Sequence, residues 1–199
     1  MSDNSTLDRA SWVITEGLSP AAVAAAIVAM VAWDSTPTAT SAVTWGMTAI
    51  VFGAAIPLGF LLFGKRAGWW GDHHVSDGAK RRWPLAVCLL SVATGAGIGV
   101  VFNGPLDLMI LAAVMCAVLA VVWLITDKGG WKVSVHSVVA VTGAAIATLL
   151  YGAWAALLVW PLALLVGWSR VQLKAHTRAQ VLVGALLGGL AAVAFAVLR

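Results

Sequence analysis

Residues 133–168 decide the fold of this chain; they read VSVHSVVAVTGAAIATLLYGAWAALLVWPLALLVGW. The stretch contains no Asp, Glu, Lys or Arg. A membrane-spanning helix needs about 20 apolar residues, so the stretch is too long for one span. We expect it to break near Tyr151-Gly152, because a single long span would put the later loops on the wrong sides of the membrane. Both halves, 133–150 and 153–168, are short, so we expect them to be buried in protein rather than to face lipid.

The rest of the chain is also predominantly apolar. Its 199 residues are 61% hydrophobic and 10% charged, whereas a soluble domain carries about 25% charged residues, so we expect an integral membrane protein. Five further apolar runs predict spans, at 18–34, 42–64, 84–102, 106–126 and 178–198. The expected fold is all-α, a polytopic transmembrane helical bundle of about six to seven spans. A polar N-terminal segment, 1–17, precedes a single membrane-embedded domain, 18–199.

Two residue patterns predict details of these spans. Pro84 suits the first turn of the third span, where its missing N–H costs nothing. Small residues spaced four apart favour close helix contacts, and they occur as Gly95 with Gly99 and as Gly184 with Gly188.

The basic residues gather on one side of the predicted bundle. One side of the bundle contains the N-terminus and three loops, 65–83, 127–132 and 169–177. Together with the adjoining span ends, these segments hold every Lys and Arg except Arg199. The positive-inside rule makes this side cytoplasmic in a multi-pass protein of the cell membrane. An anion-binding site would also collect basic residues, and counting does not separate the two causes. The net charge of +4 points to membrane lipids as partners and not to nucleic acid, because the charges adjoin apolar spans.

Three polar clusters lie on this side, each before or at the start of a predicted helix. They read VSDGAKRRWP (75–84), WKVSVHS (131–137) and GWSRVQLKAHTRAQV (167–181). Helix N-termini favour anions through their free N–H groups and the helix dipole. The clusters therefore predict a pocket for a doubly charged group such as phosphate, with five basic residues to bind it: Lys80, Arg81, Arg82, Lys132 and Arg170.

Each cluster also has a simpler interpretation when it is taken alone. The run 80–82 is typical of charges that set topology or contact headgroups. His136, one turn into an apolar helix, is typical of a hydrogen-bonded packing residue, and His176 of a loop histidine. Their combination on one side favours a functional site, since ionisable groups at membrane depth are costly and usually mark function. Adjacent histidines make a poor chelate, so His73-His74 indicates a solvated loop, and no metal site is expected.

The third cluster resembles a motif of the phosphatidic acid phosphatase type 2 superfamily of lipid phosphatases and haloperoxidases. That motif is Ser-Arg, five residues, His, three residues and Asp, and it is matched by Ser169-Arg170, His176 and, in place of Asp, Gln180. The second motif, Pro-Ser-Gly-His, is matched by 133–136 at Ser and His.

The first motif of the superfamily, Lys, six residues, Arg-Pro, is matched only at Pro84, because Val75 and Trp83 stand in place of Lys and Arg. The nearby residues 80–82 would substitute for them. The sequence also looks like the short bacterial branch of the superfamily, in which Asp77, Lys132 and Thr177 fit the pattern. The resemblance covers residues 65–198.

The resemblance implies a mechanism that needs no metal and no cofactor. His176 would attack phosphorus and form a phosphohistidine, and His136 would protonate the leaving lipid oxygen and then help to activate water. The phosphoryl oxygens would be held by Arg170, Ser134, Lys132, Lys80, Arg81 and Arg82, with Asp77 and Ser169 in support. The family Asp accepts the Nδ1–H of the nucleophile, and the carbonyl oxygen of Gln180 can accept the same bond and fix the tautomer.

The leading hypothesis is therefore an integral membrane phosphatase that acts on a lipid or polyprenyl phosphate or diphosphate. A lipid or prenyl phosphotransferase with the same intermediate is the alternative within enzymes. A transporter or structural membrane protein, in which the basic loops only set topology, is the alternative outside them. Such a protein would tolerate alanine at both His136 and His176.

Overall fold

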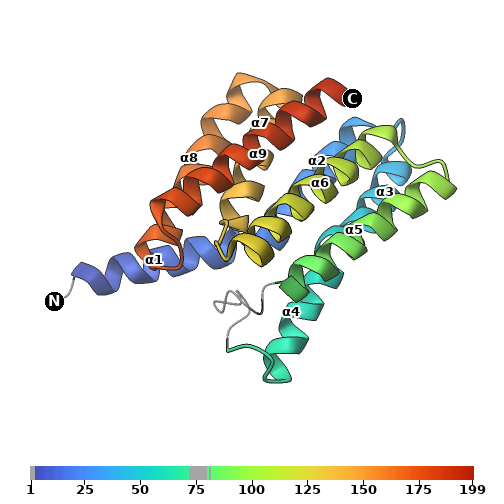
Figure 1. Ribbon diagram of the computed structural model, residues 1–199. Coiled ribbons are helices and arrows are strands. Elements are labelled where there is room, and N and C mark those ends of the chain that lie inside the picture. The colour runs from blue at the N-terminus through green and yellow to red at the C-terminus, as the bar shows by residue number, and fades with distance from the viewer. Residues whose placement is uncertain (1–2, 72–79, 81) are drawn as a thin grey trace.

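The computed structural model describes residues 3–71, 80 and 82–199, with side chains from residue 6 onward (Figure 1). Within these ranges the regular structure is helical and contains no strand. The helices are α1 (Asp3–Gly17), α2 (Pro20–Asp34), α3 (Ala39–Ile50), the π-helical turn η1 (Val51–Ala55), α4 (Ile56–Arg66), α5 (Arg82–Val101), α6 (Leu106–Gly129), α7 (Val135–Tyr151), α8 (Ala153–Gln172) and α9 (Arg178–Leu198).

Several of these helices are long and apolar enough to cross a membrane. Five qualify within the described residues: α5, α6, α8, α9 and the continuous segment Ala39–Arg66, which joins α3, η1 and α4. A sixth is added if α1 and α2, which meet at a 43° bend, are taken as one span. Helix α7 is apolar but shorter, with 17 residues. The predicted all-α membrane bundle is confirmed at this level.

The long apolar stretch breaks where the sequence indicates. Gly152 separates α7 from α8, and its φ of +77° is a backbone conformation that a side chain would strain. The expectation of burial is correct for α7, which buries residues along most of its length. It is wrong for α8, which packs on α7 and α1 through Ala163 and Val166. The opposite face of α8 is exposed, so that Leu158 keeps 72% of its surface accessible.

The N-terminal segment, expected only to be polar, forms α1 and packs against α8. The helix buries its polar side chains Ser11 and Thr15, which are 0% and 1% exposed. Its apolar side chains Trp12 and Val13 point outward, with 59% and 61% of their surface exposed. This inverted arrangement is typical of a helix with lipid on its outer side.

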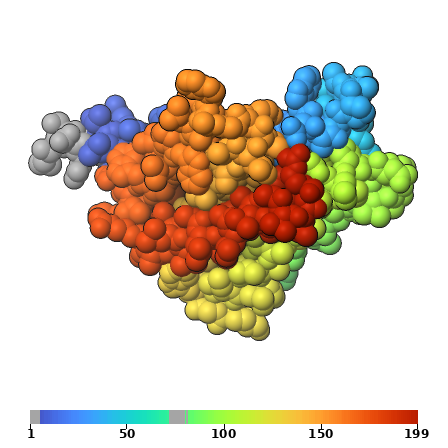
Figure 2. All heavy atoms as spheres, turned by 90° about the horizontal axis from the view of Figure 1, so that it is seen from above, coloured from blue at the N-terminus to red at the C-terminus, as the bar shows by residue number. Residues whose placement is uncertain are grey.

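Helix α9 lies against α7 on one side and α6 on the other, as the red helix in Figure 2 shows. A Cβ atom added to Gly184 would lie 2.6 Å from the carbonyl oxygen of Ser134, and one added to Gly188 would lie 2.4 Å from that of Val138. The predicted close contact at these glycines is confirmed. Gly95 is equally tight, since its added Cβ would lie 2.7 Å from Cβ of Phe52.

The π-helical turn η1 is stabilised by a neighbouring helix. Pro57 has no N–H, so it cannot donate to the carbonyl oxygen of Phe52, five residues earlier. The hydroxyl of Ser91 on α5 donates to that oxygen at 2.6 Å. Pro84 occupies the first turn of α5, as predicted. The turn thus fixes α5 against the segment Ala39–Arg66.

An ion cluster joins three helices at the end of the bundle opposite the basic loops. The guanidinium of Arg199 lies 2.7 Å from a carboxylate oxygen of Asp34 and 3.0 Å from one of Asp107. These carboxylates are at the end of α2 and the start of α6. The cluster therefore connects three helices that are distant in sequence.

Candidate functional site

Three of the predicted site residues come together at the end of an internal cavity. Arg170 lies in the last turn of α8, His176 in the loop that follows, and His136 in the first turn of α7. All three line the same cavity, and they are 3%, 7% and 7% exposed. The structure therefore gathers the arginine and both histidines, which the sequence separates by up to 40 residues, into one buried region.

The loop after α8 is folded back onto that helix. The backbone N–H groups of Ala175 and His176 both donate to the carbonyl oxygen of Arg170, each at 3.1 Å. The reversal requires Lys174 to adopt a left-handed conformation, with φ of 53°. Non-glycine residues adopt this conformation at a cost, and it recurs at functional sites. The fold thus fixes His176 close to the arginine that precedes it.

The imidazole of His176 is oriented by Gln180. Its Nδ1 lies 3.2 Å from Oε1 of Gln180, the contact that the spacing predicts. The same oxygen accepts the backbone N–H of Thr177 at 3.1 Å, as part of a capping box that begins α9. A backbone N–H can only donate, so the amide presents its oxygen, and this oxygen can only accept. Nδ1 therefore carries a proton, and whenever the ring is neutral its lone pair is at Nε2.

Ser134 acts as the N-cap of α7. Its Oγ accepts the hydroxyl of Ser137 at 2.9 Å and the backbone N–H of the same residue at 3.4 Å. Its own backbone N–H donates to the carbonyl oxygen of Gln180 at 3.3 Å. The cavity is lined in this segment by Val133, Val135 and His136, and not by Ser134. Ser134 therefore connects the starts of α7 and α9 and orients His136 through the helix.

Ser169 is engaged away from the cavity. Its hydroxyl contacts the carbonyl oxygen of Val166 at 2.8 Å and the hydroxyl of Thr15 at 3.0 Å. The guanidinium of Arg170 reaches the same Thr15 hydroxyl from Nη1, at 3.4 Å. Ser169 thus supports the arginine through Thr15 of α1, a helix that no sequence pattern connects with the site.

The other described basic residues predicted for the site do not line this cavity. Lys80 and Arg82 are exposed and do not line the cavity, and the Arg82 guanidinium lies over the Trp83 ring at 5.5 Å. Lys132 lines a second hollow, together with Lys174, Gln180 and His176, which lines both. Asp77 and Arg81 lie outside the described residues, as do His73 and His74. Among the residues that the structure does describe, no three His, Cys, Asp or Glu side chains are grouped as a metal site would require.

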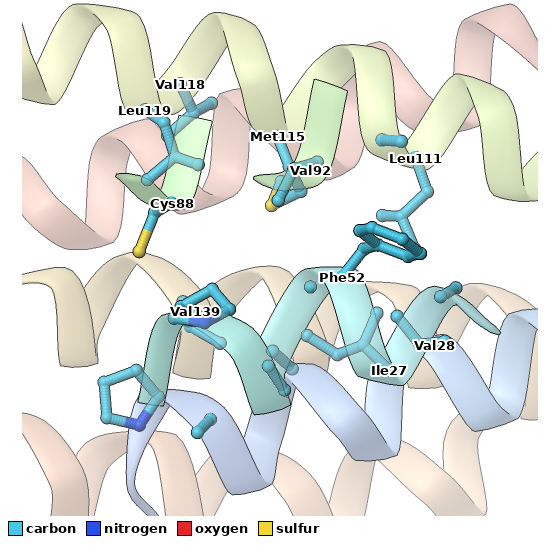
Figure 3. Close-up of a pocket in the computed structure, with 18 of the residues that line it drawn as sticks. Ile27, Val28, Phe52, Cys88, Val92, Leu111, Met115, Val118, Leu119 and Val139 are labelled. Atoms are coloured by element: carbon cyan, nitrogen blue, oxygen red, sulfur yellow. The ribbon is translucent and has the colours of Figure 1, made fainter. Parts of the chain in front are cut away.

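The cavity itself is a long apolar groove of about 300 Å³ (Figure 3). On α6 its lining extends from Pro105 to Thr126, which is roughly 30 Å of helix at 1.5 Å per residue. Figure 3 shows Ile27 and Val28 of α2 on one side and Leu111 and Met115 of α6 on the other. The groove thus has the length of the hydrocarbon core, with its charged and titratable residues at one end.

Two features of the site were missed in the sequence, for different reasons. The capping box has a readable signature, Thr-x-x-Gln before an apolar run at 177–180. Thr15 has no comparable signal, because its contacts join residues more than 150 positions apart.

Comparisons with models of protein families, with curated proteins and with solved structures find no match to this chain. Function is therefore inferred from the motifs and from the chemistry of the site.

Proposed function

We propose that this chain is an integral membrane phosphatase that hydrolyses a lipid or polyprenyl phosphate or diphosphate through a phosphohistidine at His176. The observation that supports it most directly is the oxygen of Gln180, which accepts both the Thr177 N–H and the His176 Nδ1–H. A histidine with its proton fixed at Nδ1 has the lone pair at Nε2 that a nucleophile requires.

The reaction would take place in two displacements at phosphorus. In the first, Nε2 of His176 forms a bond to phosphorus while the phosphorus–oxygen bond to the lipid breaks, and the leaving oxygen takes a proton from His136. In the second, water attacks the phosphohistidine, the phosphorus–nitrogen bond breaks, and the electron pair returns to Nε2. His136 accepts a proton from the attacking water, so that phosphate is released and both histidines are restored.

Arg170 would stabilise the charge that spreads over the phosphoryl oxygens. Its planar guanidinium suits phosphate, and its burial places the charge where water screens it least. The apolar groove supports a lipid substrate, since a hydrocarbon tail that lies along it would place a phosphorylated end beside Arg170 and the histidines. A water-soluble phosphate ester would leave this surface unfilled.

The proposed topology has seven crossings: α2, the segment Ala39–Arg66, α5, α6, α7, α8 and α9. The site then faces the cytoplasm of a cell-membrane protein, which the concentration of Lys and Arg on that side supports. A cysteine introduced at the exposed Lys174 tests this sidedness. A membrane-impermeant maleimide should label it in inverted vesicles, and labelling in intact cells would contradict the assignment.

Phosphate release by the purified protein in detergent tests the proposed activity. Substrates would include phosphatidic acid, phosphatidylglycerol phosphate, and short and long prenyl diphosphates. His176→Ala should abolish release, whereas Arg178→Ala, an exposed basic residue in the same segment, should leave it unchanged. Equal release by wild type and His176→Ala would refute the nucleophile assignment. Transfer of phosphate to an added alcohol would identify a phosphotransferase, and no turnover of any substrate would favour a non-enzymatic membrane protein.

A further inference from the structure

The side chain of Arg170 is held from outside its own motif. Thr15, in the last turn of α1, is 1% exposed, Ser169 is 0% exposed and Arg170 is 3% exposed. Their polar atoms form a continuous series with the carbonyl oxygen of Val166. Arg170 Nη1 lies 3.4 Å from Thr15 Oγ1, Thr15 Oγ1 lies 3.0 Å from Ser169 Oγ, and Ser169 Oγ lies 2.8 Å from the carbonyl oxygen.

The chemistry of its two ends fixes the direction of this series. A guanidinium N–H can only donate, so Thr15 Oγ1 accepts from Arg170 Nη1. A carbonyl oxygen can only accept, so the Ser169 hydroxyl donates its one proton to Val166. The Ser169 oxygen must then accept the proton of Thr15. Each hydroxyl donates once and accepts once, and hydrogen bonds aligned in this way polarise one another.

We infer that Thr15 is a positioning residue for the phosphate-binding arginine, and that α1 is therefore a functional part of the site. The inference rests on the proposed function, because it assigns Arg170 to the phosphoryl group. Thr15 accepts one of the five N–H donors of the guanidinium and so limits the rotation of a long side chain.

The packing of α1 supports this role. Ile14, next to Thr15, packs against a buried cluster that contains Ala140 and Val166. On the outer surface, the Gln172 side-chain amide donates to the carboxylate of Asp8 at 3.2 Å. A buried contact at Ile14 and an exposed one at Asp8 thus hold α1 against α8 near Arg170, which a helix that served only as a surface anchor would not need.

Equilibrium binding of inorganic phosphate, measured by calorimetry on the purified full-length protein, tests the inference without requiring turnover. Thr15→Val removes the hydroxyl but keeps the shape of the side chain. It should weaken phosphate binding about tenfold, because the loss of a hydrogen bond to a charged group changes an equilibrium constant by about this factor or more. Thr15→Ser keeps the hydroxyl and should restore binding. Thr44→Val is the matched control, because Thr44 is exposed on α3 and bonds only its own helix.

The series offers a second variant if Thr15→Val lowers the melting temperature. Ser169→Ala breaks the chain at its middle and should weaken phosphate binding about threefold, because Thr15 loses the acceptor that orients it. In the double variant the loss should not exceed that of Thr15→Val alone, since both changes disrupt one network.

The outcomes separate this inference from the proposed function. Unchanged phosphate affinity in Thr15→Val, equal weakening in Thr15→Ser, or no phosphate binding by the wild type would overturn the inference. If the wild type binds phosphate and the variants behave as expected, yet no lipid phosphate is hydrolysed, the positioning of Arg170 stands and the proposed phosphatase activity fails.

Discussion

Replacing Gly188 with alanine should separate α7 from α9, the helices that carry His136 and Gln180. The added Cβ would lie 2.4 Å from the carbonyl oxygen of Val138 and 3.2 Å from the backbone nitrogen of Thr142. Real Cβ atoms essentially never approach closer than 3.0 Å, and both contacts are backbone, which cannot rotate away. Helices α7 and α9 must therefore move apart by at least the difference between 2.4 and 3.0 Å.

The cost of this separation has two parts. Overpacking of a dense helix contact costs about 1–3 kcal/mol. The hydroxyl of Thr142 also donates to the carbonyl oxygen of Gly188 at 3.1 Å, and weakening that bond adds about 0.5–1 kcal/mol. We expect Gly188→Ala to lower the free energy of unfolding by roughly 2–4 kcal/mol.

The neighbouring glycine provides a matched control. A Cβ added to Gly189 would meet nothing within 4 Å, so Gly189→Ala should be neutral or stabilise the helix by up to about 1 kcal/mol. The measurement is the free energy of unfolding in mixed micelles, from a denaturant titration followed by circular dichroism. Equal values for the two variants would refute the argument that α7 and α9 depend on backbone contact at this position.

Further variants test the site, the π-helical turn and the groove. Gln180→Leu removes the acceptor for the His176 Nδ1–H and should lower phosphate release at least tenfold. Gln180→Asp keeps an acceptor and should preserve phosphate release. Loss of turnover in the Asp variant would contradict the assignment of residue 180. Ser91→Ala leaves the Phe52 carbonyl without its donor and should lower the free energy of unfolding by about 1–2 kcal/mol, whereas Thr94→Ala, which removes an exposed bond within α5, should cost less. Among prenyl phosphates of increasing length, kcat/KM should rise until the extended chain is roughly 30 Å long and then stop rising; a continued rise would show that the chain does not lie in the groove.

The fold was predictable from the sequence where a local residue type and the length of an apolar span indicate the same structure. The break at Gly152, the position of Pro84 and the contacts at Gly184 and Gly188 each follow from one residue type whose physical effect is local. The outward face of α8 was not predictable in this way. Length alone cannot show which side of an apolar helix meets protein, because lipid and a protein core favour the same side chains.

The site was predictable to the extent that it is encoded in short segments. His176 and Gln180 are one helical turn apart, so their contact follows from the spacing. Lys80, Arg82 and Lys132 were expected to join Arg170 because all are basic and on one side. None of the three lines the groove, and Lys132 instead lines a second hollow with His176 and Gln180. A charge count gives the side of the bundle but not the direction of a side chain, which tertiary contacts such as that of Thr15 decide.

The ion cluster at Arg199 has a consequence for what the groove can hold. It joins α2 to α6 through Asp34 and Asp107, and nearby Ile27 and Leu108 belong to one buried cluster, so these two walls are held together at the end farthest from the histidines. The cluster thus limits how far α2 and α6 can separate at that end of the groove. If the proposed lipid substrate lies in the groove, the separation that this cluster allows would influence which tail lengths fit, even where the head groups are identical.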